Sequence, residues 1–228
     1  MVSKSYGWVD AVLALIKKDL IDECRTRFAF TSIILFAMTT LVMVSFSTGA
    51  FVLDSGMHAA FLWIIIFFSS MTALARSFIK EEEQGTARIL RISTTPEVIF
   101  IAKLMFNLVI LLGLLAVLYP LYLILMNPPA AKNNLLVMLF LILGSSCLAG
   151  TTTILAAIVS QAGAKHTLLP IIAFPVLLPV LLTAIRGTSL VLAGKFLNAV
   201  LPDLIFLFSF LVIIVTASLL LFPFVWED

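Results

Sequence analysis

Six long apolar runs, separated by short polar connections, occupy almost all of this 228-residue chain. Hydrophobic residues make up 62% of the sequence and charged residues only 11%, a composition far from that of a soluble globular domain. A helix that crosses a bilayer needs roughly 20 mostly apolar residues, so the chain has room for about six such helices and little else. We therefore predict an all-α integral membrane protein whose spans lie near Ala29–Val52, Met57–Ile79, Val98–Met126, Asn133–Ser160, Thr167–Ile185 and Leu201–Val225.

The basic residues divide unevenly between the two sides of this predicted membrane domain. Eleven of the 14 Lys and Arg residues fall on the side of the N-terminus, and only Lys132, Arg186 and Lys195 fall on the other side. Because Lys and Arg concentrate in cytoplasmic loops, both termini are predicted to be cytoplasmic. Lys103, near the cytoplasmic end of the third span, is expected to extend towards the interface. The first apolar run spans the bilayer in full, so we expect no cleavable signal peptide.

Residues 1–28 predict a cytoplasmic interface helix ahead of the membrane domain of residues 29–228. Apolar side chains recur there at three- and four-residue spacing, which is typical of an amphipathic helix. The apolar face consists of Val9, Val12, Leu13, Ile16 and Leu20, and the charged residues mainly opposite it are Asp10, Lys17, Lys18, Asp22 and Arg25. Glu23 departs from this pattern. We expect the helix to lie in the membrane interface with Trp8 as an aromatic anchor; the alternative is a charged segment that only fixes topology.

One charged segment, KEEEQGTARILRISTTPE at residues 80–97, separates the second and third apolar runs. Gly85 accepts a left-handed backbone conformation and predicts the end of the preceding helix. Thr86 can cap a second, short helix of roughly 12 Å, and Thr95 with Pro96 can begin the next span. A membrane protein with one compact charged helix at its surface usually offers that helix to a soluble partner.

We call residues 80–97 the coupling segment. In the predicted contact with a soluble partner, the charges orient the docking and the apolar side chains supply buried area. The predicted contact residues are Glu81, Glu82, Glu83, Gly85, Arg88, Ile89, Leu90, Arg91 and Ile92.

The fifth apolar run, LLPIIAFPVLLPVLL, carries Pro170, Pro175 and Pro179, and the third run carries Pro120. Each proline removes a backbone donor, so we predict that the fifth helix is kinked or locally unwound. A static bend and a bend that changes during a working cycle remain alternatives. The connection over residues 186–200 is predicted to dip into the outer interface as a short re-entrant or lateral helix.

The sequence contains no motif for a common enzymatic site. Its only Gly-Lys pair lacks the remainder of a nucleotide-binding P-loop. His58 and His166 are predicted on opposite faces of the membrane, so they cannot share a metal, and each is interpreted as a loop-end residue. Cys24 and Cys147 lie at different predicted depths and are interpreted as packing residues. We therefore predict no catalytic residue, no metal site and no nucleic-acid partner.

Four segments, in order and over nearly the full length, resemble the CcmB family, the ABC-transporter permease subunits of the cytochrome c maturation system. KKDLIDECRTR resembles the family's entry helix, and FLWIIIFFSSMTALARSFIKEEEQGT its second span and the charged turn that follows. LRISTTPEVIFIAKLMFN resembles the next cytoplasmic segment and the start of the third span. LLPIIAFPVLLPVLLTA resembles the proline-rich fifth span.

The resemblance implies a type II ABC exporter-like permease in the bacterial inner membrane, without catalytic activity of its own. A separate CcmA-like ATPase subunit would bind ATP, and CcmC-like and CcmD-like membrane proteins and a CcmE-like haem chaperone would be further partners. ATP hydrolysis would drive haem handling or export, or release of the haem-loaded chaperone. The complex would handle haem, but the tryptophan-rich haem motif of CcmC is missing here, so no main haem site is assigned to this chain. Membrane lipid is an expected partner, and a second copy of the chain stays open as one.

Two other classes of function share parts of this pattern. A type II permease that exports another hydrophobic substrate, such as a lipid, drug or polysaccharide, has the same layout of spans. An integral-membrane lipid-modifying enzyme is less favoured, because its acidic cluster would have to be residues 81–83. Three consecutive acids point in different directions around a helix and do not converge on one site.

Overall fold

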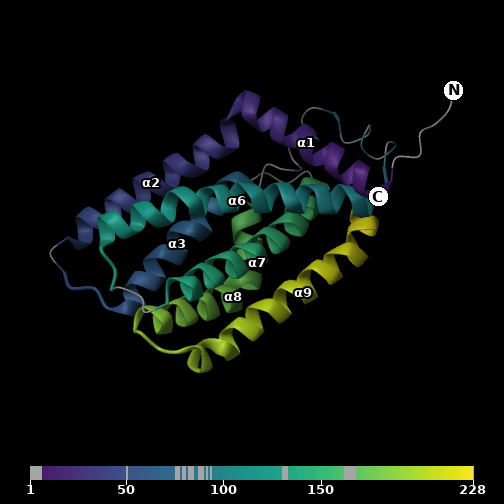
Figure 1. Ribbon diagram of the computed structural model, residues 1–228. Coiled ribbons are helices and arrows are strands. Elements are labelled where there is room, and N and C mark those ends of the chain that lie inside the picture. The colour runs from purple at the N-terminus through teal and green to yellow at the C-terminus, as the bar shows by residue number, and fades with distance from the viewer. Residues whose placement is uncertain are drawn as a thin grey trace.

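The computed structural model describes residues 7–49, 51–74, 94–129, 133–161 and 168–227, together with Phe78, Glu81, Gly85, Thr86, Leu90 and Ile92. Among these residues the secondary structure is entirely helical (Figure 1). The helices are α1 (Trp8–Thr26), α2 (Phe28–Thr48), α3 (Ser55–Leu74), α6 (Pro96–Met126), α7 (Asn134–Gln161), α8 (Leu168–Leu192) and α9 (Leu197–Glu227).

Six of these helices, α2, α3 and α6 to α9, are long and apolar enough to cross a membrane, which confirms the predicted fold class. The prediction for residues 186–200 is wrong, because α8 continues to Leu192 and α9 begins at Leu197. Thr188 and Val191 are buried against the bundle, so helix α8 extends over residues that the sequence assigns to a lateral segment. Gly187 serves close packing there and not a bend, since a Cβ at this position would lie 2.1 Å from Cε1 of Phe140.

Helix α7 occupies the centre of the bundle and contacts α3, α6, α8 and α9 (Figure 1). Its small residues let neighbouring helices approach closely, as is common in membrane bundles. At Gly144, a Cβ would lie 2.1 Å from Cη2 of Trp63 on α3. The indole of Trp63 is buried and donates a hydrogen bond of 3.0 Å from Nε1 to Oγ1 of Thr188 on α8. This contact therefore joins α3, α7 and α8.

The prolines do not interrupt the helices that contain them. Helix α8 is continuous through Pro175 and Pro179, and α6 is continuous through Pro120. Pro170 is in the first turn of α8, where a backbone N–H has no partner within the helix. The predicted local unwinding of α8 is thus not observed, because the opposite face of the helix is held against α3 and α7. Pro120, Pro175 and Pro179 face outward, and a role in bending stays a prediction.

The bundle has two ends with different architecture (Figure 1). Helix α1 and the C-terminal end of α9 lie at one end, which we call the terminal end. The connections α2–α3, α6–α7 and α8–α9 lie at the other end, which we call the pocket end. Between α1 and α2 the chain turns at Arg27, whose φ of 52° is in the left-handed region. This turn lays α1 across the N-terminal part of α6.

Candidate functional site

Four charged side chains meet at the terminal end, and we call them the charge cluster: Lys18 and Asp19 of α1, Glu81 after α3, and Lys103 of α6. Nζ of Lys103 lies 2.8 Å from Oδ2 of Asp19 and 2.9 Å from Oε1 of Glu81. Nζ of Lys18 lies 2.8 Å from the same Oε1 of Glu81 and 3.7 Å from Oδ1 of Asp19. Two positive and two negative groups therefore join α1, the coupling segment and α6.

The charge cluster is largely buried. Asp19, Glu81 and Lys103 are only 8%, 4% and 5% exposed, and burial of a charge is costly unless the charge is paired. Burial on its own would raise the pKa of Glu81, but Lys103, Lys18 and the hydroxyl of Thr86 together lower it to about 2. Burial works against the charge of Lys18, yet Glu81 and the nearby acids raise its pKa above the usual value. Both groups are therefore ionised at neutral pH.

The turn at Gly85 positions Glu81. Gly85 has φ of +66°, the left-handed conformation that the sequence predicts for it. The backbone N–H of Thr86 donates to the carbonyl oxygen of Glu81 at 3.0 Å, and the Thr86 hydroxyl donates to the Glu81 carboxylate. The N–H of Leu90 then donates to the carbonyl oxygen of Thr86 at 3.0 Å. The turn directs the Glu81 carboxylate towards the two lysines.

Packing of α1 on α6 brings the other half of the cluster into place. Val12 is buried against Val98 and Ala102 of α6. Ala102 directly precedes Lys103 in the sequence. As a result the part of α1 that bears Asp19 faces the protein. The assignment of Lys18 to an outward charged face is therefore only partly right, because its ammonium group binds Glu81.

The outward face of α1 is both apolar and basic. Trp8, Val9 and Leu13 are exposed, as are Lys17 and Arg25. An apolar groove of about 470 Å³ runs along this face, and the residues that line it are Leu13, Ile16, Lys17, Leu20, Ile21 and Cys24. Apolar side chains flanked by Lys and Arg are typical of a helix in a membrane interface.

Glu23, which departs from the amphipathic pattern of α1, has a structural role. Its Oε1 accepts a hydrogen bond of 2.8 Å from the backbone N–H of Phe30 in the first turn of α2. The first N–H groups of a helix lack partners within the helix, so this carboxylate caps α2. It fixes the angle at which α1 joins the membrane domain.

An aromatic cluster of Phe78, Phe100, Phe222 and Trp226 lies next to the charge cluster. Ring centroids are 5.6 Å apart for Phe78 and Trp226, and 5.4 Å apart for Phe100 and Phe222. Phe100 precedes Lys103 by three residues on α6, and side chains three residues apart lie on the same helical face. The aromatic cluster joins the chain just before the coupling segment to α6 and to the C-terminal end of α9.

The structure separates the predicted contact residues of the coupling segment into two groups. Glu81 and Leu90 are buried, whereas Gly85 is exposed and Ile92 is 89% exposed. The remaining predicted contacts lie outside the described residues: Glu82, Glu83, Arg88, Ile89 and Arg91. The assignment of this segment to ATPase contact stays a prediction.

Sequence reasoning missed Asp19 and Lys103 as members of the site. Asp19 follows Val12 by seven residues, so it lies on the buried stripe of α1. Lys103 lies on a helix of 31 mostly apolar residues. An acid on an apolar stripe and a lysine on an apolar helix are the signal for a buried pair, but the sequence does not show which groups meet.

A family model described as CcmB protein matches residues 10–227, which is almost the entire chain. The chain belongs to the CcmB family. Members of the CcmB family are the membrane component of the haem-exporting ABC system in cytochrome c maturation, so the resemblance seen in the sequence is confirmed. No curated protein sequence matches the chain. The family and the six apolar helices together indicate a multi-pass membrane protein.

Proposed function

We propose that this CcmB protein is the permease subunit that converts ATP hydrolysis by a separate ATPase into movement of its membrane helices. That movement would serve haem handling or export, or release of a haem-loaded chaperone. The observation that carries the proposal is the charge cluster, because its ion pairs tie the coupling segment to α1 and α6. The CcmB protein would contribute no catalytic residue, and ATP would bind to the partner.

Three anchors attach the coupling segment and its flank to the bundle. Just before the segment, Phe78 packs in the aromatic cluster with α6 and α9. Within the segment, Glu81 binds Lys18 and Lys103, and Leu90 is buried in the main hydrophobic core. A force on a segment anchored at several points displaces the attached helices, since protein interiors are close-packed and deform little. These contacts support transmission from the segment to α1, α6 and α9.

Ile92 is the best-placed described residue for contact with the ATPase. Its side chain is apolar and projects from the segment almost fully exposed, and buried apolar anchors carry much of the energy of protein interfaces. Leu90, two residues earlier, is buried within the protein itself. We assign docking to Ile92 and anchoring to Leu90.

This function requires the terminal end to face the cytoplasm, as the excess of Lys and Arg on that side of the sequence supports. In the bacterial inner membrane, a CcmA-like ATPase would then bind at the coupling segment. Lipid headgroups would meet Trp8, Lys17 and Arg25 on the outward face of α1. CcmC-like and CcmD-like subunits would pack beside the spans, and a CcmE-like chaperone would approach the pocket end. A second copy of the chain is an alternative neighbour within the membrane.

Co-purification of the ATPase subunit from membranes tests this proposal. Ile92→Asp is expected to reduce recovery of the ATPase at least tenfold, because a carboxylate would be buried in the contact. Leu135→Asp is the matched control, since Leu135 is also an exposed apolar residue but lies in the first turn of α7 at the pocket end. Full recovery of the ATPase with Ile92→Asp would remove the coupling segment from the contact. Leu90→Asp is expected to reduce the yield of folded protein itself.

A further inference from the structure

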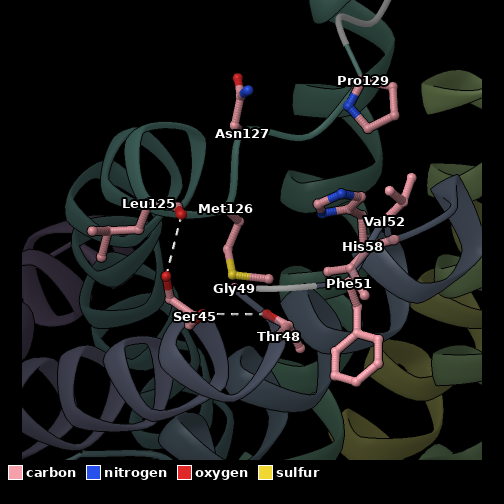
Figure 2. A pocket seen from close by; sticks show the side chains of 11 residues that line it. Ser45, Thr48, Gly49, Phe51, Val52, His58, Leu125, Met126, Asn127 and Pro129 are labelled. Atoms are coloured by element: carbon pink, nitrogen blue, oxygen red, sulfur yellow. Dashed lines mark hydrogen bonds between the residues drawn. The ribbon is translucent and has the colours of Figure 1, made fainter.

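A cavity of about 470 Å³ opens at the pocket end, between the end of α2, the start of α3 and the end of α6. Its volume is in the range of small-molecule sites. Figure 2 shows Ser45 on one side of the cavity, His58 and Phe51 on the other, and Met126 between them. No Lys, Arg, Asp or Glu is among the described residues that line it. A cation that enters the cavity therefore meets no lysine or arginine among these residues.

Two of the three helix ends at the cavity are C-terminal ends. Helix α2 ends at Thr48 and α6 ends at Met126, and both residues line the cavity. The C-terminal end of a helix carries a partial negative charge and carbonyl groups without a partner within the helix. The third end, the N-terminus of α3, is positive, but the Asp54 carboxylate caps it and accepts a hydrogen bond of 2.7 Å from the N–H of Met57. The helix ends together therefore favour a positive charge in the cavity.

The sequence after α6 keeps carbonyl groups of this helix available. Pro128 and Pro129 stand four residues after Ile124 and Leu125, and a proline has no N–H to donate to those carbonyl oxygens. The carbonyl oxygen of Leu125 instead accepts a hydrogen bond of 3.2 Å from the hydroxyl of Ser45 on α2. A carbonyl oxygen has two lone pairs, so it can accept a second bond. The end of α6 therefore offers acceptors to a ligand that has several donor hydrogens.

Most polar side chains of the lining have already used their donor hydrogens. The hydroxyls of Ser45 and Thr48 donate to backbone carbonyl oxygens at 3.2 and 2.7 Å. The Tyr122 hydroxyl donates its one hydrogen to the His58 carbonyl oxygen, so at the 3.1 Å contact of Oη with Nδ1 the imidazole is the donor. Nε2 of His58 has no hydrogen-bond partner among the described residues. Apart from the amide of Asn127, these side chains therefore have acceptors and no free donors.

The position of the cavity indicates that the cation is part of a lipid. Helices α2 and α6 are long and apolar enough to span a membrane, so their ends lie near the level of the lipid headgroups. Phe51 and Leu125 line the cavity and are exposed, and Phe46, next to Ser45 on α2, is 85% exposed. Apolar surface beside a polar cavity fits a molecule with acyl chains and a cationic headgroup.

We propose that the cavity at the pocket end binds the headgroup of an aminophospholipid such as phosphatidylethanolamine, with its primary ammonium at the carbonyl groups that end α2 and α6. A primary ammonium has three N–H donors, which match the acceptors of the cavity. The quaternary ammonium of phosphatidylcholine has no N–H, and phosphatidylglycerol has no cationic group. The site goes beyond the proposed function and does not depend on it.

Native mass spectrometry of the purified full-length chain tests the proposal. Phosphatidylethanolamine, phosphatidylcholine and phosphatidylglycerol with the same acyl chains are added in equal amounts, so that only the headgroup differs. Adducts of phosphatidylethanolamine are expected to be about fivefold more abundant than either of the others, because two helix C-termini favour its cation. Equal abundance with either of the other lipids would overturn the assignment. Displacement of the lipid by an equimolar amount of ethanolamine would show a site for soluble amines and would contradict the lipid assignment.

Gly49→Lys tests the location of the lipid. Gly49 follows the last residue of α2, lines the cavity and has φ of −54°, so a lysine fits its backbone conformation and is favoured at this helix end. Its ammonium group is expected to occupy the acceptors and to abolish the preference for phosphatidylethanolamine. Ala193→Lys is the matched control, because Ala193 follows the last residue of α8 at the same end of the bundle but is not among the residues that line the cavity. A preference that Gly49→Lys retains, or that both variants lose, would place the lipid elsewhere.

Asn127→Asp changes the charge of the cavity in the opposite direction. Asn127 lines the cavity with φ of 42°, a left-handed conformation that Asp also adopts. The added carboxylate is expected to raise the abundance of phosphatidylethanolamine adducts roughly threefold, because hydrogen bonds between charged groups are stronger than those between neutral ones. Unchanged or lower abundance would show that the cavity does not attract a cation and would overturn the proposal.

Discussion

The two ends of this helical bundle use polar side chains in opposite ways. At the terminal end, charged groups within 3.7 Å of one another are buried and tie three segments of the chain together. At the pocket end, His58 lines an open cavity, and its Nδ1 lies 3.1 Å from the hydroxyl oxygen of Tyr122. The ion pair there, Arg186 with Asp203, is long at 3.7 Å, and the arginine side chain is 70% exposed. The terminal end is therefore held by buried ion pairs, whereas at the pocket end a His–Tyr contact lies beside an open cavity.

Helix α6 contributes to both ends. Lys103 lies in its second turn, and Tyr122 and Met126 lie in its last two turns. Helices α3, α7 and α8 are packed closely at Gly144, Trp63 and Thr188. The two ends therefore belong to one closely packed unit. Substitutions at each end and in the packing between them can test how differently the two ends are held.

The largest effect on stability is expected from Glu81→Ala. This substitution leaves Lys103 buried with only Asp19 for two lysines, and loss of one partner from a buried ion pair typically costs about 3–5 kcal/mol. Thermal or denaturant unfolding of the purified protein in detergent measures the change. Glu97→Ala is the control, because Glu97 is an exposed acid in the first turn of α6, where an acid contributes at most about 1 kcal/mol.

A compensating variant sharpens this test. Glu81→Leu together with Lys103→Met leaves Lys18 and Asp19 as a balanced pair, so most of the lost stability is expected to return. If the double variant is no more stable than Glu81→Ala, the cost comes from lost packing and not from an unpaired charge.

Acidification is expected to destabilise the terminal end first. The pKa of Glu81 is lowered from 4.5 to about 2 in the folded protein. The ionised carboxylate therefore stabilises the folded state above pH 4.5, and this contribution is lost as the pH falls from 4.5 towards 2. The pKa difference corresponds to about 3 kcal/mol. Unfolding curves of wild type and Glu81→Gln should differ most above pH 4.5 and converge near pH 2; a constant difference would contradict the assignment.

Gly144→Ala is expected to loosen the packing of α7 against α3. Its Cβ would lie 2.1 Å from Cη2 of Trp63, a fully buried ring, and overpacking of a core typically costs about 1–3 kcal/mol. Gly113→Ala is the matched control, because its Cβ would meet the partly exposed ring of Phe30 at 2.9 Å, which can move aside at lower cost. The measurement is thermal unfolding of the purified protein in detergent. Equal stability of Gly144→Ala and Gly113→Ala would show that the ring of Trp63 moves aside as easily as that of Phe30.

The smallest stability effect is expected from Tyr122→Phe at the pocket end. The substitution removes one hydroxyl from a short hydrogen-bonded chain, and such a bond contributes about 1 kcal/mol. Unfolding in detergent is expected to change far less than with Glu81→Ala. A loss as large as that of Glu81→Ala would show that the pocket end is as tightly constrained as the terminal end.

Features encoded locally were predicted well from the sequence. The six spans follow from the length of the apolar runs, and the turn at Gly85 follows from the conformational freedom of one residue. The pairing of Lys18 with Glu81 was missed because the two residues are 63 positions apart. His58 was interpreted as a loop-end residue, and it does lie in the first turn of α3, but its burial depends on Tyr122, which is 64 positions away.

The wrong predictions about the fold also concern contacts between residues that are far apart in the sequence. The segment over residues 186–200 has bend-permitting glycines and intermediate polarity, which by themselves favour a lateral helix. Burial of Thr188 and Val191 against the bundle extends α8 instead. Tertiary contacts also keep α8 continuous at Pro175 and Pro179, although each proline lacks a backbone donor.

The continuity of α6 has a geometrical consequence. From Lys103 to Met126 the helix is uninterrupted, and 23 residues at 1.5 Å each span roughly 35 Å. If the helix pivots near the lysine by about 5°, its far end moves sideways by about 3 Å, which is close to the diameter of a water molecule. Leu125 and Met126, which line part of the cavity at the pocket end, move with this helix, so a small rotation at one membrane surface changes the space at the other.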